Sequence, residues 1–156
     1  MAKTFLNNHP SRGLRNNNPG NLVKTKINWA GKLKDSKDAR FEQFETLAYG
    51  IRAQMMDIIN DISKDKKNTL RKLISEYAPA FENDTNAYIN AVAKSVGIGA
   101  DQQITKITQP LILSLSRAIY KVELGKYHAD ITDSDIKQGY ALLPKVQAGL
   151  TIEKKK

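Results

Sequence analysis

Residues 12–22 read RGLRNNNPGNL and combine two arginines, a run of three asparagines and a Pro-Gly pair. Asparagine and glycine tolerate left-handed backbone and proline punctuates turns, so this stretch is typical of an irregular turn. Side-chain amides also match sugar hydroxyls and N-acetyl groups, although asparagine in turns mostly bonds its own backbone. A sugar-binding role and a structural role are therefore both open for Asn17, Asn18 and Asn21.

Positive charge gathers around this turn. The chain of 156 residues has a net charge of +9, of which residues 1–41 carry +7, whereas residues 42–152 are neutral. A localised positive surface indicates a polyanionic partner, such as nucleic acid, an anionic membrane or an anionic wall polymer. The length predicts a single domain over residues 1–150, with residues 1–11 as a flexible arm and 151–156 as a basic disordered tail.

Several classes of protein are excluded by what the sequence lacks. There is no cysteine and there are two histidines, so thiol nucleophiles, iron–sulfur clusters and zinc knuckles are ruled out, and we expect neither a metal nor a cofactor. No glycine-rich phosphate loop or dinucleotide fingerprint occurs. No apolar run has the length of a membrane span, and the first residues have no signal-peptide core, so no signal peptide is expected.

The hydrophobic pattern outside the turn predicts an α+β fold that is mainly α. Short β-like pieces at 22–27, 29–33 and 40–44 predict a small antiparallel sheet near the N-terminus. From Thr46 onward the period is helical. We expect about five helices: one after Thr46 through Ile62, one over 70–77, one from Asp84 or Thr85 to Gly97, one from Pro110 to Gly125, and one opened by a Thr132–Asp135 capping box.

Glu123 stands out in the last turn of the fourth of these helices. At 100° per residue it lies at the border of the apolar arc, and it is one or two residues from the negative end of the helix dipole that Gly125 marks. Burial and the helix end both disfavour an ionised carboxylate, so its pKa should rise, which suits a general acid for glycosidic cleavage. The alternative is a boundary glutamate paired with Lys121 or Lys126.

A set of short blocks carries a family resemblance over about residues 11–143. They are residues 12–22, Trp29-x-Gly31, Phe41-x-x-Phe44, residues 49–53 (YGIRA), Tyr77-Ala78-Pro79 with residues 82–89, and Ala118-Ile119-x-x-x-Glu123-x-Gly125. Together they resemble phage and prophage virion-associated peptidoglycan hydrolases that are lysozyme-like and related to glucosaminidases and lytic transglycosylases. The resemblance implies a lysozyme-like fold.

The order of the blocks differs from that family, in which the helix ending in the catalytic glutamate precedes the asparagine-rich block. Here no glutamate precedes Glu42. The resemblance therefore implies a circular permutation, which close chain termini would permit, with Glu123 as the catalytic acid. It further implies substrate binding by a set of polar and aromatic residues, namely Arg15, Asn17, Asn18, Asn21, Trp29 and Tyr127. A second carboxylate from Glu42, Glu45 or Glu82 is left open.

The function expected from these observations is a phage-type glycosidase that degrades peptidoglycan, as a muramidase, lytic transglycosylase or glucosaminidase. The alternative is a catalytically inactive structural or cell-wall-binding phage protein. The expected partners are peptidoglycan glycan strands and other virion proteins. Nucleic acid is not expected as a partner, because the sequence has no recognisable helix-turn-helix. We expect a monomer with no membrane span, located in the virion or host cytoplasm and acting in the periplasm or cell wall.

Overall fold

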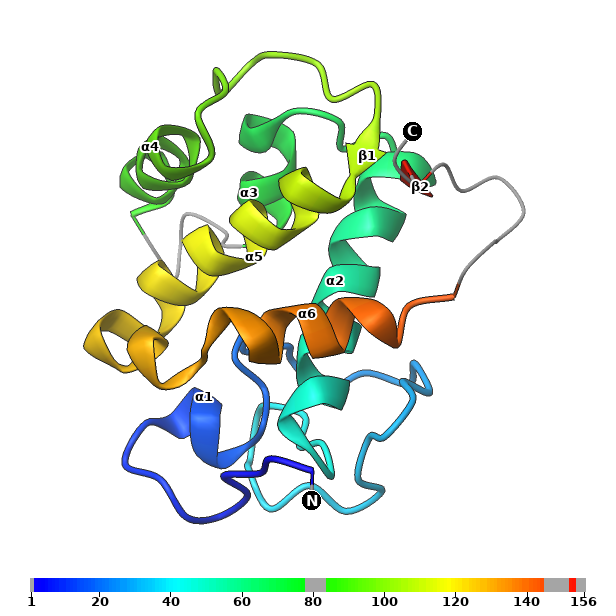
Figure 1. Cartoon of the computed structure of the whole chain (residues 1–156), viewed down its shortest axis with the longest axis vertical. Helices are drawn as coiled ribbons and strands as arrows, with labels where there is room; N and C mark the ends of the chain where they lie inside the picture. Colours follow the sequence, from blue (N-terminus) through cyan, green and yellow to red (C-terminus); the bar gives the residue numbers. More distant parts are fainter. Residues whose placement is uncertain (1, 78–83, 145–151, 154–156) are drawn as a thin grey trace. The chain divides into compact units, whose positions relative to one another are not determined.

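The computed structural model describes residues 2–77, 84–144 and 152–153, and over these ranges the chain is mainly helical (Figure 1). Its elements are α1 (Arg12–Arg15), α2 (Leu47–Ser63), α3 (Leu70–Tyr77), α4 (Thr85–Val96), α5 (Gln109–Leu124), the 3-10 helix η1 (Gly125–Asp130) and α6 (Asp133–Ala141). Two-residue strands β1 (Ile107–Thr108) and β2 (Ile152–Glu153) pair in parallel. No helix in the described ranges is both long and apolar enough to cross a membrane.

Local capping signals set several helix ends. The Asp84 side chain accepts from the Ala87 amide at the start of α4, and Gly97 follows the end of that helix. The capping box of Thr132 and Asp135 opens α6. Both predicted starts are confirmed, because a side chain that satisfies free amides at a helix N-terminus is a signal contained within four residues of sequence.

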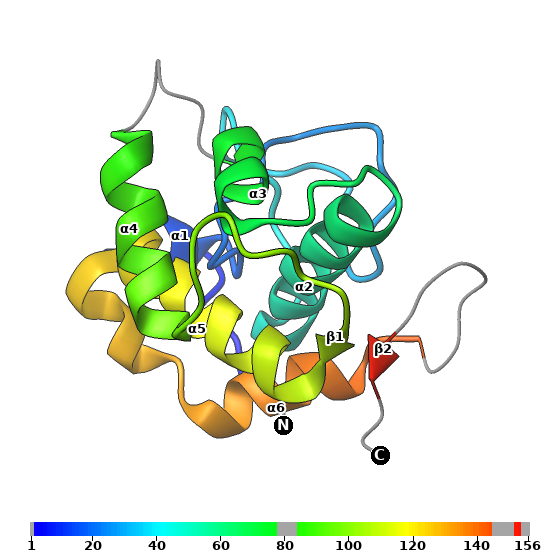
Figure 2. The same ribbon diagram turned by 90° about the horizontal axis from the view of Figure 1, so that it is seen from above.

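The chain divides into two compact units. Unit 1 comprises the residues up to Met56 together with Ile119–Leu143, and unit 2 comprises Asp57–Ala118 and the chain beyond Leu143. In unit 1, α6 packs closely on α2, since a Cβ on Gly139 would lie 2.3 Å from Ile51 Cγ2. In unit 2, α3 packs beside α4 (Figure 2). The expected single domain over 1–150 and the flexible arm over 1–11 stay predictions.

The predicted α+β fold with a small antiparallel sheet near the N-terminus is wrong. The segment forms only two isolated antiparallel bridges, Val23 with Phe41 and Lys32 with Phe44. Beside the few backbone bonds at these bridges, side chains supply much of the hydrogen bonding: the Asn18 side-chain amide donates to the carbonyls of Leu22 and Glu42, and the Lys32 ammonium donates to those of Thr25 and Ile27. Such side-chain bonds compete with the backbone hydrogen bonds of a β-sheet, and residues 22–44 fold as a loop that side chains hold in place. This segment is called the braced loop below.

Candidate functional site

The asparagine turn meets the end of α5 through one hydrogen bond. Asn21 Nδ2 donates to Glu123 Oε1 at 2.8 Å, across 102 residues of sequence. Asn21 takes up a left-handed backbone with φ of 52°, which asparagine adopts more readily than most residues. Glu123 is the penultimate residue of α5 and is half-buried. The bond therefore orients a partly exposed carboxyl group at the end of a helix.

Tight packing of α1 fixes the position of this pair. A Cβ on Gly13 would lie 2.7 Å from Leu124 Cδ2 and 3.0 Å from Asn21 Oδ1. Alanine at position 13 would therefore force the Leu124 and Asn21 side chains to shift. Asn21 Oδ1 is itself buried and accepts no hydrogen bond from the described part of the chain. A buried acceptor left unpaired costs about 1–3 kcal/mol, and such groups are rare in folded proteins.

Asn17 and Asn18 hold the turn together from inside. Both side chains are 0% exposed. Asn17 Nδ2 donates to Phe44 O at 2.9 Å, and Asn18 accepts from the Leu22 amide at 2.9 Å while donating to two carbonyls. Their amides thus bond protein groups, which is the structural role left open by the sequence. Substrate binding by Asn17 and Asn18 stays a prediction without support from this burial.

The other residues expected to bind substrate lie in different settings. Arg15 is half-buried and its Nη1 donates to Pro10 O at 3.0 Å. Trp29 is half-buried in the braced loop. Tyr127 belongs to η1, which follows α5 directly, and its ring packs edge-on against His9 with centroids 5.1 Å apart. Among the six predicted binding residues, Asn21 contacts Glu123 directly.

The candidates for a second carboxylate fare differently. Glu42 is 2% exposed and forms a buried ion pair with Lys32 at 3.0 Å, while its Oε2 also accepts from the Thr25 amide. The Glu42 carboxylate therefore has a structural role in the braced loop. Glu45 is exposed, and Glu82 lies outside the described residues.

A network around His9 was missed by the sequence analysis. His9 Nδ1 accepts from the Ser11 amide at 2.9 Å, so Nε2 carries the ring proton of the neutral form and faces Asp130 Oδ2 at 2.8 Å. Lys3 Nζ pairs with Asp135 at 2.7 Å. These bonds hold residues 3–11 against η1 and α6, more than 120 residues away in sequence. A local sequence pattern cannot predict contacts at that separation.

Unit 2 holds a different electrostatic feature on α2. Burial, with the charges of Glu76 and Asp65, raises the pKa of Asp57 to about 6. Burial, together with Asp57 and Asp65, raises the pKa of Asp61 to about 7. Nowhere in the described ranges do three or more histidine or acidic side chains gather in a way that could hold a metal ion.

Comparison with known proteins shows sequence similarity to a phage protein. No family model matches the chain. It is 35% identical over 136 residues to a protein called "Protein P5" of Pseudoalteromonas phage PM2. The match covers 85% of this chain and 82% of that protein.

Proposed function

Because the chain belongs to the family of phage proteins that includes protein P5 of Pseudoalteromonas phage PM2, we propose that it is a virion-associated glycosidase that cleaves host peptidoglycan. The observation that carries the proposal is the hydrogen bond between Asn21 and Glu123 at 2.8 Å. It joins the asparagine turn to the glutamate at a helix end, the two parts of the sequence that resemble lysozyme-like peptidoglycan hydrolases.

Glu123 is the general acid of the proposed reaction. Its carboxyl proton passes to the glycosidic oxygen as the bond from that oxygen to C1 breaks, and the bonding electron pair leaves with the oxygen. The resulting carboxylate then takes a proton from the hydroxyl that attacks C1. If that hydroxyl belongs to water, the reaction is hydrolysis; if it belongs to the muramic acid itself, the product is an anhydro sugar. Asn21 acts as a positioning residue that holds the carboxyl group in one orientation.

The uneven charge supports an anionic substrate. Residues 1–41, which contain the asparagine turn, carry +7, while residues 42–152 are neutral. Attraction between exposed charges is screened over about 8 Å at physiological ionic strength. Binding to the anionic wall, and activity with it, should therefore fall as salt is added.

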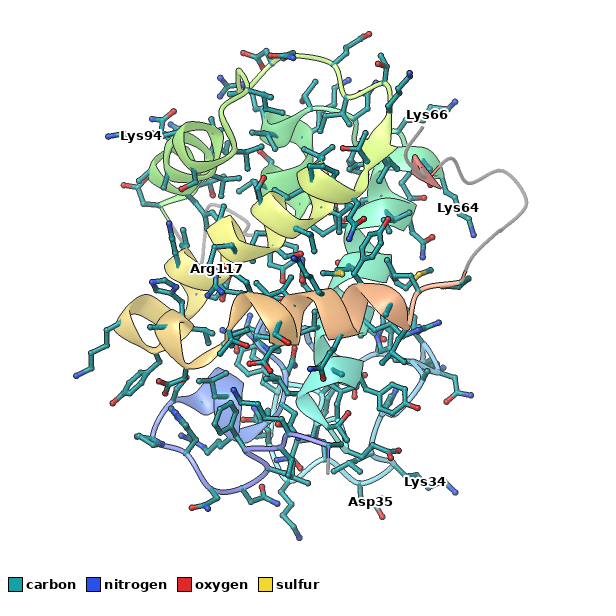
Figure 3. The ribbon with its side chains drawn as sticks, in the orientation of Figure 1. Lys34, Asp35, Lys64, Lys66, Lys94 and Arg117 are labelled. Atoms are coloured by element: carbon teal, nitrogen blue, oxygen red, sulfur yellow. The ribbon has the colours of Figure 1, made fainter. Side chains whose placement is uncertain are left out.

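The test is digestion of purified peptidoglycan sacculi with mass spectrometry of the released sugars. Glu123→Gln removes the proton donor at almost constant shape and should lower the release rate at least about a hundredfold. The matched control is Asp35→Asn, which neutralises an exposed carboxylate in the basic segment (Figure 3) and should leave the rate unchanged. Thermal unfolding of each variant checks that the fold is kept.

The products and the variant together separate the possible functions. Anhydro ends indicate a transglycosylase, reducing muramic acid ends a muramidase, and reducing glucosamine ends a glucosaminidase. Equal release by wild type and Glu123→Gln would overturn the role of Glu123. Sedimentation with sacculi in the absence of any released sugar would overturn the enzyme and favour a wall-binding virion protein.

A further inference from the structure

A short turn in the braced loop exposes apolar and basic side chains together. Val23 and Ile27 are 47% and 48% exposed, and among the described residues only Val122 and Leu142 are other large apolar side chains exposed to this degree. Lys24 and Lys26, between them in sequence, are exposed as well. Residues 23–27 are called the 23–27 turn below. Two of the most exposed apolar side chains and two cations thus share five residues.

The 23–27 turn is held in one shape by a largely buried cation. Lys32 Nζ donates to Thr25 O at 2.9 Å and to Ile27 O at 2.8 Å, and it pairs with Glu42 at 3.0 Å. The side chains of Lys32 and Glu42 are only 18% and 2% exposed. Removing two charges from water is costly, and one attested use of a buried pair is to specify a single conformation. Here the Lys32 ammonium group, paired with Glu42, holds the carbonyls of Thr25 and Ile27 on either side of it and so fixes the conformation of the 23–27 turn.

We propose that the 23–27 turn binds the surface of an anionic lipid bilayer. The Cα atoms of Val23 and Ile27 are at most about 14 Å apart, so one flat surface can reach both. Lysines near an anionic leaflet are attracted to its phosphate groups, and valine and isoleucine gain by entering the headgroup and acyl boundary. An anionic glycan would attract the lysines equally well, but it has no apolar interior in which the side chains of Val23 and Ile27 could be buried. The pair therefore favours lipid.

This binding is separate from the proposed cleavage of peptidoglycan. Glu123 takes no part in it, so Glu123→Gln should bind vesicles as the wild type does. The two proposals can consequently fail independently of each other.

The experiment is sedimentation of the full chain with vesicles of equal parts phosphatidylglycerol and phosphatidylcholine, compared with vesicles of phosphatidylcholine alone. Binding is expected only to the anionic vesicles. Lys24→Gln with Lys26→Gln should weaken partitioning about thirtyfold, and Val23→Ser with Ile27→Ser at least about tenfold. Trp29, the one tryptophan in the chain, lies two residues beyond Ile27, and its emission should shift to the blue on binding.

Matched controls remove the same chemistry elsewhere. Lys64→Gln with Lys66→Gln neutralises two exposed lysines with the same spacing (Figure 3), and Val122→Ser with Leu142→Ser removes the other exposed apolar pair. All these positions are exposed, so the fold should persist, as circular dichroism will check. The proposal is overturned by equal binding to neutral vesicles, by wild-type binding of the Val23→Ser, Ile27→Ser variant, or by an equal loss in either control.

Discussion

At the scale of single residues, Asn18 adds side-chain hydrogen bonds to a segment in which the Glu42 amide already donates to Leu22 O. Its amide accepts from the Leu22 amide and donates to the carbonyls of Leu22 and Glu42, with no exposure to solvent. Aspartate has the same shape but cannot donate to two carbonyls. We therefore expect Asn18→Asp to lower the free energy of unfolding by about 3 kcal/mol, as buried groups lose their partners, with urea denaturation as the measurement.

The control for this prediction is Asn28→Asp, which makes the same chemical change at an exposed position of the braced loop and should alter stability by less than about 0.5 kcal/mol. If Asn18→Asp unfolded at the same urea concentration as Asn28→Asp, the amide of Asn18 would not be what braces the loop.

At the scale of elements, α2 comes unusually close to the asparagine turn. A Cβ on Gly50, in the first turn of α2, would lie 1.6 Å from the Asn17 carbonyl oxygen. The obstacle is backbone, which cannot swing aside as a flexible side chain can. Gly50→Ala should thus cost about 3 kcal/mol of stability, measured as a lower midpoint of thermal unfolding.

Gly99→Ala is the comparison for Gly50→Ala, because a Cβ there would meet its nearest neighbour at 3.7 Å, an ordinary contact. A stability change within about 0.5 kcal/mol is expected for it. Equal midpoints for the two variants would contradict the close approach of α2 to the turn.

The elements also show why the sequence predicted some features and missed others. Helix α6 was predictable because Thr132 and Asp135 satisfy the first amides within four residues. The absence of the predicted sheet was not predictable, because it depends on which backbone carbonyls the side chains of Asn18 and Lys32 bond in the folded chain. The partial burial of Glu123 was predictable from its position at the border of the apolar face of the helix.

Contacts between distant parts of the site had no such local signal. The family resemblance assigned Glu123 and Asn21 to one site but did not predict the bond between them, and nothing in the sequence suggested the pairing of His9 with Asp130. A side chain on a helix face can be located from periodicity, whereas a pair 100 residues apart exists only once the chain has folded.

At the scale of the whole molecule, Asp38 and Asp135 in unit 1 have lowered pKa values, whereas Asp57 and Asp61 on α2 in unit 2 have raised ones. In unit 1, the Arg12 guanidinium bonds Asp38 and holds the pKa of that carboxyl well below its usual range. Burial alone would raise the pKa of Asp135, but bonds from Lys3 and Thr132 outweigh it and the pKa is lowered. In unit 2, the pKa values of Asp57 and Asp61 are raised to about 6 and about 7.

These shifts have opposite consequences for stability. Lowered pKa values in unit 1 mean that stabilisation is present above about pH 4 and is lost as the pH falls further. Raised values in unit 2 mean that the unfolded chain releases its protons first, near pH 4, while the folded unit keeps them. The contribution of Asp57 and Asp61 to stability is therefore most favourable below about pH 4 and falls as the pH rises from about 4 to about 7.

We expect unfolding of the wild type to cost less at pH 8 than at pH 5, by on the order of 2 kcal/mol after allowing for the half-exposed Asp61. Asp57→Asn with Asp61→Asn should raise stability at pH 8 and reduce the difference, measured by urea denaturation at both pH values. Asp101→Asn is the control: Arg71 lowers the pKa of this exposed unit 2 carboxyl, which is ionised throughout that range. An unchanged difference in the double variant would show that Asp57 and Asp61 are not its source.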